Sequence, residues 1–154
     1  MIVVSDTTAV SNLLTVGRAD LLVSLFRRVL IPPAVWAELL AFHSDLPDWL
    51  EVVTVTDSSR VLAFHKQVHP GEAEAIALAL EVKPDWLLID DADGRKLAKS
   101  EGAPVVGLMG VLLMAKRDGF LTEVKTLMTS LASEAGFYLS AAVRDEVLRL
   151  ANES

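Results

Sequence analysis

Acidic side chains stand at the ends of two strand-like segments of this sequence. Asp6 ends the apolar run that begins at Met1, and Asp90 and Asp91 end a second run that begins at Trp86. In open parallel sheets, chemistry takes place beyond the carboxyl ends of the strands, near the point where strand order reverses. The sequence therefore predicts that these aspartates lie at one edge of a sheet.

Three glutamates are placed where they can join this edge. Glu38 lies in the helix expected after the second strand, and Glu72 and Glu74 lie in the first turn of the helix that precedes Trp86. Two like charges 4 Å apart cost about 4 kcal/mol at an effective dielectric constant of 20, so converging carboxylates must protonate or bind a cation. Hard divalent cations prefer oxygen ligands. The acids therefore predict a metal site that activates water against a phosphodiester.

The elements that position these acids alternate along the chain between short apolar runs and helical patterns. Strands that read as continuous apolar runs are typical of parallel sheets buried on both faces. The pattern predicts an α/β fold: a three-layer α/β/α sandwich with a central parallel sheet of about five strands, plus a C-terminal helical hairpin. The expected strands are MIVVSD (1–6), RVLIP (28–32), LEVVTVT (50–56), DWLLID (85–90) and APVVGL (103–108).

The 154 residues predict a single domain over 1–154, because the chain has the size of one domain and no Pro/Gly/Ser linker interrupts it. Asp57 and Ser140 are expected to cap helices, and the helices of about 121–152 are expected to pack on the rest. The other expected helices are 9–16, 20–27, 33–41, from Asp57 to about 67, 72–81, 93–100 and 110–118.

The acidic motifs resemble those of the PIN-domain family. The likeness is closest to a prokaryotic branch related to the toxins of toxin-antitoxin pairs. It implies a metal-dependent ribonuclease that holds one or two Mg²⁺ or Mn²⁺ ions, acts on RNA and has an antitoxin protein as a candidate partner. The motifs are VVSDTTAVSNLL, IPPAVWAELL, PGEAEAIALALE and WLLIDDADGRKLA, and the likeness extends through APVVGLMGVLLMAKRDGFL.

The resemblance assigns catalytic and metal-binding roles to four acids, Asp6, Glu38, Glu72 and Asp91. The third acidic position of the family falls between two glutamates of GEAE. Glu72 is favoured because it follows the glycine, and Glu74 remains the alternative metal ligand.

Other polar residues near these motifs are assigned supporting roles. Asp93 is a further candidate metal ligand, and Thr8 and Asp90 are candidates for orienting the direct ligands. Adjacent strand-end residues point in opposite directions, so Asp90 is expected to point away if Asp91 faces the metal. Glu81, seven residues after Glu74 on one helical stripe, is expected on a solvated face with it.

The net charge of −7 repels nucleic acid, so an RNA substrate requires bound cations or a local basic patch. Arg95, Lys96 and Lys99 follow the aspartates on one expected helix and are candidate RNA-binding residues, with a solvated helix face as the alternative. His65 and His69 are spaced as in a zinc motif, but a lysine replaces its glutamate, so we expect a loop or helix-end pair.

Two other functions would retain the same acids. One is a non-catalytic PIN-like module that binds RNA or a protein partner, and the other is a phosphohydrolase acting on small molecules. Hydrophobic residues make up 52% of the chain, which favours a homodimer that covers apolar surface. We expect a cytoplasmic protein, because no stretch reaches the length of a membrane span, no secretory signal is recognised and cysteine is absent.

Overall fold

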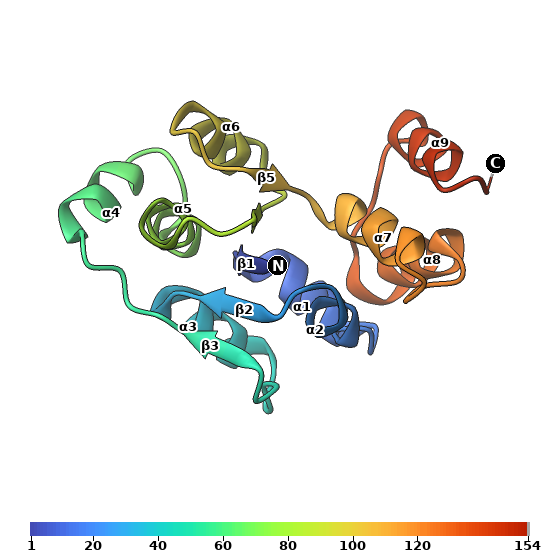
Figure 1. Cartoon of the computed structure of the whole chain (residues 1–154), viewed down its shortest axis with the longest axis horizontal. Helices are drawn as coiled ribbons and strands as arrows, with labels where there is room; N and C mark the ends of the chain where they lie inside the picture. The colour runs from blue at the N-terminus through green and yellow to red at the C-terminus, as the bar shows by residue number, and fades with distance from the viewer. Residues whose placement is uncertain (154) are drawn as a thin grey trace.

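The structure is a computed structural model that describes residues 1–153, and a five-stranded sheet lies at its centre. All strand pairs are parallel, in the order β3-β2-β1-β4-β5 (Figure 1). Strand order reverses between β1 and β4, because β2 and β3 lie on one side of β1, whereas β4 and β5 lie on the other. The predicted parallel α/β/α sandwich is confirmed. The strands are β1 (Ile2–Ser5), β2 (Arg28–Ile31), β3 (Leu50–Val52), β4 (Trp86–Leu88) and β5 (Val105–Val106).

Successive side chains of each central strand enter two different apolar cores. In β1, Val3 packs in one core and Val4 in the other, and Leu88 and Leu87 of β4 divide in the same way. All four side chains are fully buried. Because neighbouring residues of a strand point to opposite faces, such strands require helices on both sides.

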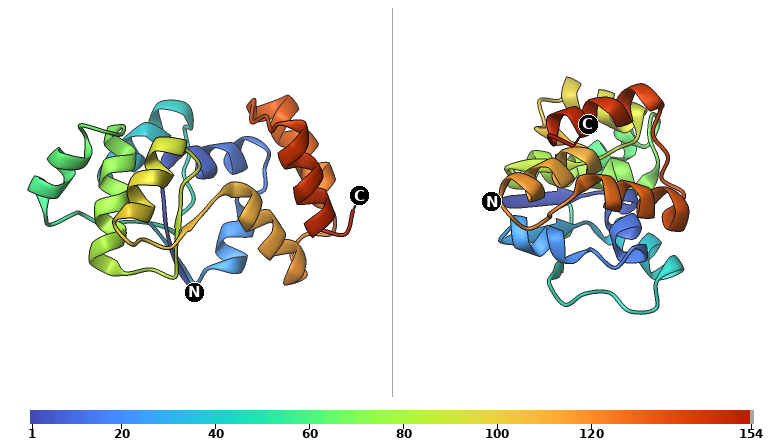
Figure 2. Two further views of the ribbon diagram at one scale, coloured as in Figure 1. Left: turned by 90° about the horizontal axis from the view of Figure 1, so that it is seen from above. Right: turned by 90° about the vertical axis from the view of Figure 1, so that its right-hand side faces the viewer.

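Helices cover both faces of the sheet. On one face lie α4, α5 and α6, and on the other lie α1, α2, α3 and α7 (Figure 1). The C-terminal helices α8 and α9 extend the second layer at the end of the molecule that carries the C-terminus (Figure 2). Within residues 1–153, no helix is long and apolar enough to cross a membrane. The helices are α1 (Thr7–Thr15), α2 (Asp20–Leu25), α3 (Pro33–Phe42), α4 (Ser58–Phe64), α5 (Pro70–Val82), α6 (Ala92–Ser100), α7 (Leu108–Arg117), α8 (Val124–Ala135) and α9 (Ala141–Leu150).

Two of the helices that follow or precede the acids begin earlier than predicted. Helix α1 begins at Thr7, directly after Asp6, rather than at Ala9. Helix α5 begins at Pro70, which places Glu72 at its third position. Proline is well suited to a first helical turn, because the N–H that it lacks would have no partner there. Asp6 therefore directly precedes α1, and Glu72 is the third residue of α5 rather than its first.

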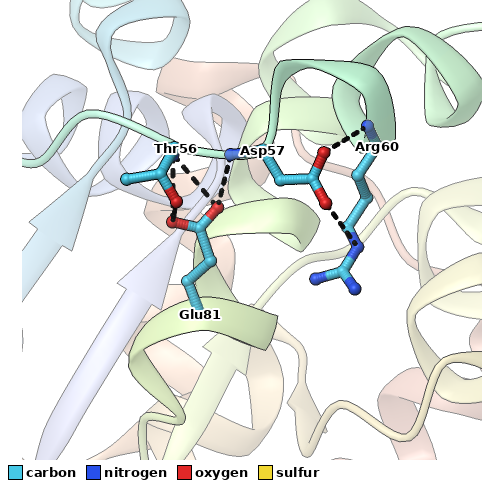
Figure 3. A network of polar contacts seen from close by, with 4 residues as sticks. All are labelled: Thr56, Asp57, Arg60 and Glu81. Carbon is cyan, nitrogen blue, oxygen red and sulfur yellow. Dashed lines mark hydrogen bonds and ion pairs between the residues drawn. The ribbon is translucent and has the colours of Figure 1, made fainter.

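The start of α4 is fastened to the end of α5 by Glu81 (Figure 3). The Glu81 carboxylate accepts the backbone N–H groups of Thr56, at 3.0 Å, and Asp57, at 3.2 Å, and the Thr56 hydroxyl at 2.8 Å. Asp57 in turn accepts the Arg60 N–H at 3.1 Å, which confirms the predicted helix cap. Glu81 is partly exposed, as expected for a solvated face, but its carboxylate also joins two elements. The third strand ends at Val52 rather than at Thr56, because its partner strand β2 ends at Ile31, opposite Val52.

Candidate active site

The first two acidic motifs leave the sheet side by side. Strands β1 and β4 are neighbours with Ser5 opposite Leu88, and the Asp6 N–H donates to the Leu88 carbonyl at 3.0 Å. The next residues of β4 are therefore Ile89 and the aspartates, at the same edge as Asp6. This edge is the point where strand order reverses, as the strand pattern predicted.

Asp6 is a buried carboxylate, and one of its oxygens has no hydrogen-bond partner within residues 1–153. Its side chain is 2% exposed, and its Oδ1 atom accepts no hydrogen bond from any residue of 1–153. Burial raises its pKa well above the usual range, and the negative charges of Asp90 and Glu72 raise it further. A buried charge without a partner is costly, so this group requires a proton or a cation.

The four acids assigned catalytic roles by the resemblance line one cavity of about 290 Å³. They come from four separate segments: the end of β1, helix α3, the first turn of α5 and the loop before α6. The full lining is Asp6, Thr7, Thr8, Glu38, His69, Glu72 and Asp91. The fold thus brings together acids that are up to 85 positions apart in the chain.

Glu38 is held in the cavity from two sides. The Thr7 hydroxyl donates to Glu38 Oε2. On the other side, a Cβ at Gly71 would lie 2.9 Å from the Glu38 Cδ, so the close approach of this carboxylate to α5 requires glycine. Thr8, the predicted supporting hydroxyl, lines the cavity but is exposed. Sequence reasoning missed Thr7, because it expected the helix to begin two residues later.

Glu72 combines a structural bond with a place in the cavity. Its Oε1 accepts the His69 N–H at 3.1 Å, which caps the start of α5. The side chain is 8% exposed, and burial raises its pKa, as does the nearby Asp91 charge, despite the His69 bond that lowers it. A Cβ at Gly94 would lie 3.0 Å from Glu72 Oε2, so α6 also passes close to this carboxylate.

The two adjacent aspartates after β4 have different partners. Asp91 is exposed, lines the cavity and caps α6, because its Oδ2 accepts the Gly94 N–H at 2.9 Å. Asp90 does not line the cavity. Both of its oxygens accept the Leu108 N–H, at 3.2 and 3.0 Å, at the start of α7, and burial raises its pKa. Its charge nevertheless acts on Asp6.

Two further metal-ligand candidates lie outside this cavity. Glu74 Oε1 accepts the Ala34 N–H at 3.2 Å and so satisfies the start of α3. A helix turns about 200° over two residues, so Glu72 and Glu74 cannot share a face. Asp93 is exposed and lines a neighbouring cavity instead.

None of the three basic candidates on α6 lines the acidic cavity. Arg95 is half-buried, and its Nη1 donates to the Ile89 carbonyl at 2.9 Å, which ties α6 to the end of β4. Lys96 and Lys99 are exposed and line neither the acidic cavity nor its neighbour. The Arg95 charge nevertheless acts on the half-buried Asp90, where it opposes the burial that raises the pKa of that group. The role of these three side chains in RNA binding stays a prediction.

Within residues 1–153, no three acidic or histidine side chains are gathered tightly enough to form a ready-made metal-binding group. The donor set still fits a hard divalent cation. Asp6 carries a buried oxygen without a partner, and Glu38, Glu72 and Asp91 offer further carboxylate oxygens to the same cavity. Mg²⁺ usually keeps several waters and takes only one or two carboxylates directly, so a tight group of three protein ligands is not required.

Comparison with known proteins gives one match over nearly the whole chain. A family model described as a PIN domain matches residues 2–153. None of the curated proteins searched matches the chain. The matched range includes all four acidic segments that meet at the cavity.

Proposed function

The chain belongs to the PIN-domain family, whose domains are generally nucleases, and we propose that it is a divalent-metal-dependent endoribonuclease that hydrolyses RNA phosphodiesters. The observation that carries this proposal is Asp6, a buried carboxylate that has an oxygen without a partner among residues 1–153 and that lines a cavity with three other carboxylates. The family supports nuclease chemistry, and the acidic cavity supports its dependence on a cation.

The residues that would hold Mg²⁺ or Mn²⁺ are Asp6, Glu38, Glu72 and Asp91. The bound cation supplies positive charge to a cavity that otherwise repels phosphate, and it acidifies the attacking water. A cation held there would lower the pKa of Asp6, because its charge would oppose the burial and the acidic neighbours that raise it.

The remaining residues of the site set the positions of these carboxylates. Thr7 fixes the rotamer of Glu38 through its hydroxyl, and the His69 N–H fixes one oxygen of Glu72. Asp91 is the most exposed of the four acids, so solvent and substrate reach it most easily. It is the carboxylate placed to accept the proton of the attacking water.

The proposal is tested by incubating the purified chain with labelled oligoribonucleotides in Mg²⁺, Mn²⁺ or EDTA. Cleavage is expected in either cation and not in EDTA. Asp6→Asn and Asp91→Asn are expected to reduce cleavage on the order of 100-fold or more, since each removes a charged ligand or base. Glu74→Gln is the matched control, because it neutralises an acid of the same region that lies outside the cavity, and it is expected to cleave like the unmodified chain.

Each alternative function gives a different result in this assay. RNA binding without cleavage in either cation, unchanged by Asp6→Asn, would indicate a non-catalytic binding module. Hydrolysis of nucleotides or phosphate esters that RNA fails to inhibit would indicate a small-molecule phosphohydrolase.

A further inference from the structure

A second cavity, of about 410 Å³, adjoins the acidic one. The two share three lining residues, His69, Glu72 and Asp91, so only these side chains lie between them. One wall of the second cavity is the loop between α4 and α5, and the opposite wall is the start of α6. Its lining is His65, Lys66, Gln67, Val68, His69, Glu72, Asp91 and Asp93.

The loop between α4 and α5 is held in one conformation by its own bonds and by two anchors. Phe64 and Val68 are buried in the core under α5. The Gln67 and Val68 N–H groups donate to the Phe64 carbonyl at 2.9 and 3.1 Å. The His65 Nδ1 atom lies 3.1 Å from the Val68 carbonyl oxygen, a bond that uses this nitrogen as the donor. These bonds and contacts therefore fix the backbone that carries the side chains of Lys66 and Gln67.

The whole of α4 is also fixed relative to α5, which carries Glu72. At the start of α4, Glu81 binds the backbone of Thr56 and Asp57 (Figure 3). At its end, the chain passes through His69, whose N–H is bound by Glu72. The loop and the acidic cavity therefore belong to one rigid arrangement.

The loop supplies a lysine, whereas no lysine or arginine lines the acidic cavity. Lys66 makes no ion pair within the described part of the chain, whereas Arg28 and Lys116 pair with Glu51 and Glu153 at 2.9 and 2.8 Å. Gln67 adds an amide. A polyanion that enters the acidic cavity must pass charged neighbours of its own sign, so a cation at the entrance lowers the free energy of its binding.

We propose that the α4–α5 loop binds the RNA strand next to the scissile phosphodiester, with Lys66 contacting a phosphate and Gln67 contacting the adjoining nucleotide. This inference rests on the proposed function, which it deepens by placing the path of the substrate. It also replaces the basic residues of α6 as the expected binding surface, because Lys96 and Lys99 line neither cavity.

The dimensions of the second cavity favour an unpaired strand. A cavity of about 410 Å³ lies within the size range of sites that take one small ligand, whereas a base-paired duplex is too wide to enter a site of this size. Unpaired nucleotides can be splayed out of a strand, which allows them to enter such a cavity.

The test measures RNA binding in the cleavage-deficient Asp6→Asn background, by fluorescence anisotropy of a labelled single-stranded oligoribonucleotide over a range of salt concentrations. Lys66→Ala is expected to weaken binding about fivefold at 0.1 M salt and to reduce the salt slope by about 0.7, the value for one phosphate contact on a single strand. Lys99→Ala is the matched control, since it removes an exposed lysine that lines neither cavity, and no change in slope is expected. Lys66→Arg is expected to restore most of the affinity.

In the cleaving chain, Lys66→Ala is expected to raise KM about fivefold and to leave kcat nearly unchanged, because the residue binds a part of the substrate that does not react. Equal effects of Lys66→Ala and Lys99→Ala on the salt slope would overturn the inference, as would tighter binding of duplex RNA than of single strands. Cleavage that depends on Asp91 but not on Lys66 would refute the inference and leave the proposed function intact. Absence of cleavage under all conditions would refute the function, whereas the binding measurement would still decide the role of the loop.

Discussion

Asp6 and Glu153 are both carboxylates with little exposure, but they differ in the number of hydrogen-bond donors that surround them. Glu153 Oε2 accepts Lys116 Nζ at 2.8 Å and the Val124 N–H at 2.7 Å, and its Oε1 accepts the Lys125 N–H at 2.9 Å. Asp6 has one oxygen without a partner among the described residues, and burial and three acidic neighbours raise its pKa.

The pKa values of the two groups follow this difference. Burial raises the pKa of Glu153, but the bonds from Lys116, Lys125 and Val124 outweigh it and hold the pKa below the usual range. Glu81 shows the same balance, since the Thr56 and Asp57 donors outweigh its burial. Glu153 and Glu81 each accept several donors, whereas Asp6 keeps an oxygen without a partner among residues 1–153 and lies among other acids. Three measurements test this difference between Asp6 and Glu153.

The largest expected effect is stabilisation by a divalent cation. At a Mn²⁺ concentration 100 times its dissociation constant, the folded chain is expected to gain about 2.7 kcal/mol, which raises Tm by roughly 5–10 °C. Asp6→Asn is expected to remove most of this shift, whereas Glu153→Gln retains it, because only Asp6 belongs to the cavity. Thermal denaturation with and without EDTA measures the effect, and an equal Tm shift in both variants would place the cation elsewhere.

The second effect concerns Glu153, which joins the C-terminal end of the chain to α7 and α8. Glu153→Gln is expected to lower the free energy of unfolding by about 2 kcal/mol at pH 7, because it weakens a helix cap and an ion pair together. A carboxyl group with a lowered folded-state pKa contributes stability above its unfolded pKa and loses it as pH falls. Urea denaturation should therefore show the difference shrinking toward pH 3.

The variant should cleave RNA at the normal rate below its melting temperature, because Glu153 is not part of the cavity. A large loss of cleavage by folded Glu153→Gln would contradict the separation of structural from functional carboxylates.

The smallest expected effect is a gain in stability on removal of a carboxylate, in contrast to the loss expected for Glu153→Gln. The raised pKa of Asp6 means that its ionisation destabilises the metal-free fold, a cost that is absent below the unfolded pKa near 4 and grows as pH rises toward the folded pKa. In EDTA at pH 7, Asp6→Asn is expected to raise the free energy of unfolding on the order of 1 kcal/mol, because it removes a buried charge. This gain should vanish toward pH 3. A variant that is less stable than the unmodified chain at pH 7 would show that the carboxylate stabilises the fold.

Much of the architecture was predictable from local patterns. Continuous apolar runs predict a parallel sheet, because a strand buried on both faces cannot alternate with polar residues. The helix caps at Asp57 and Ser140 were also predictable, and both side chains accept the expected backbone N–H groups. The placement of Asp6 and the aspartates after Ile89 at one edge followed from strand order in such sheets.

The assignment of individual side chains depended on contacts between distant segments. Glu81 and Glu74 match a solvated helical stripe in the sequence, but they bind backbone N–H groups of segments that the fold brings beside α5. Arg95 is a candidate RNA-binding residue in the sequence, and in the fold its Nη1 donates to the Ile89 carbonyl. No local pattern encodes these partners.

The amino-acid sequence is sufficient to show that acids follow the first and fourth strands, because each strand is marked by a short run of apolar residues. That both groups of acids lie at the carboxyl ends of parallel strands follows from the same local pattern. Only the tertiary structure decided which of them share the cavity. Glu72 enters it and Glu74 does not, because the rotation of α5 is set by packing against the sheet. Thr7 rather than Thr8 binds Glu38, because that bond depends on where α1 begins and how α3 lies against it. Whether a carboxylate is saturated or left without a partner is a property of the assembled fold.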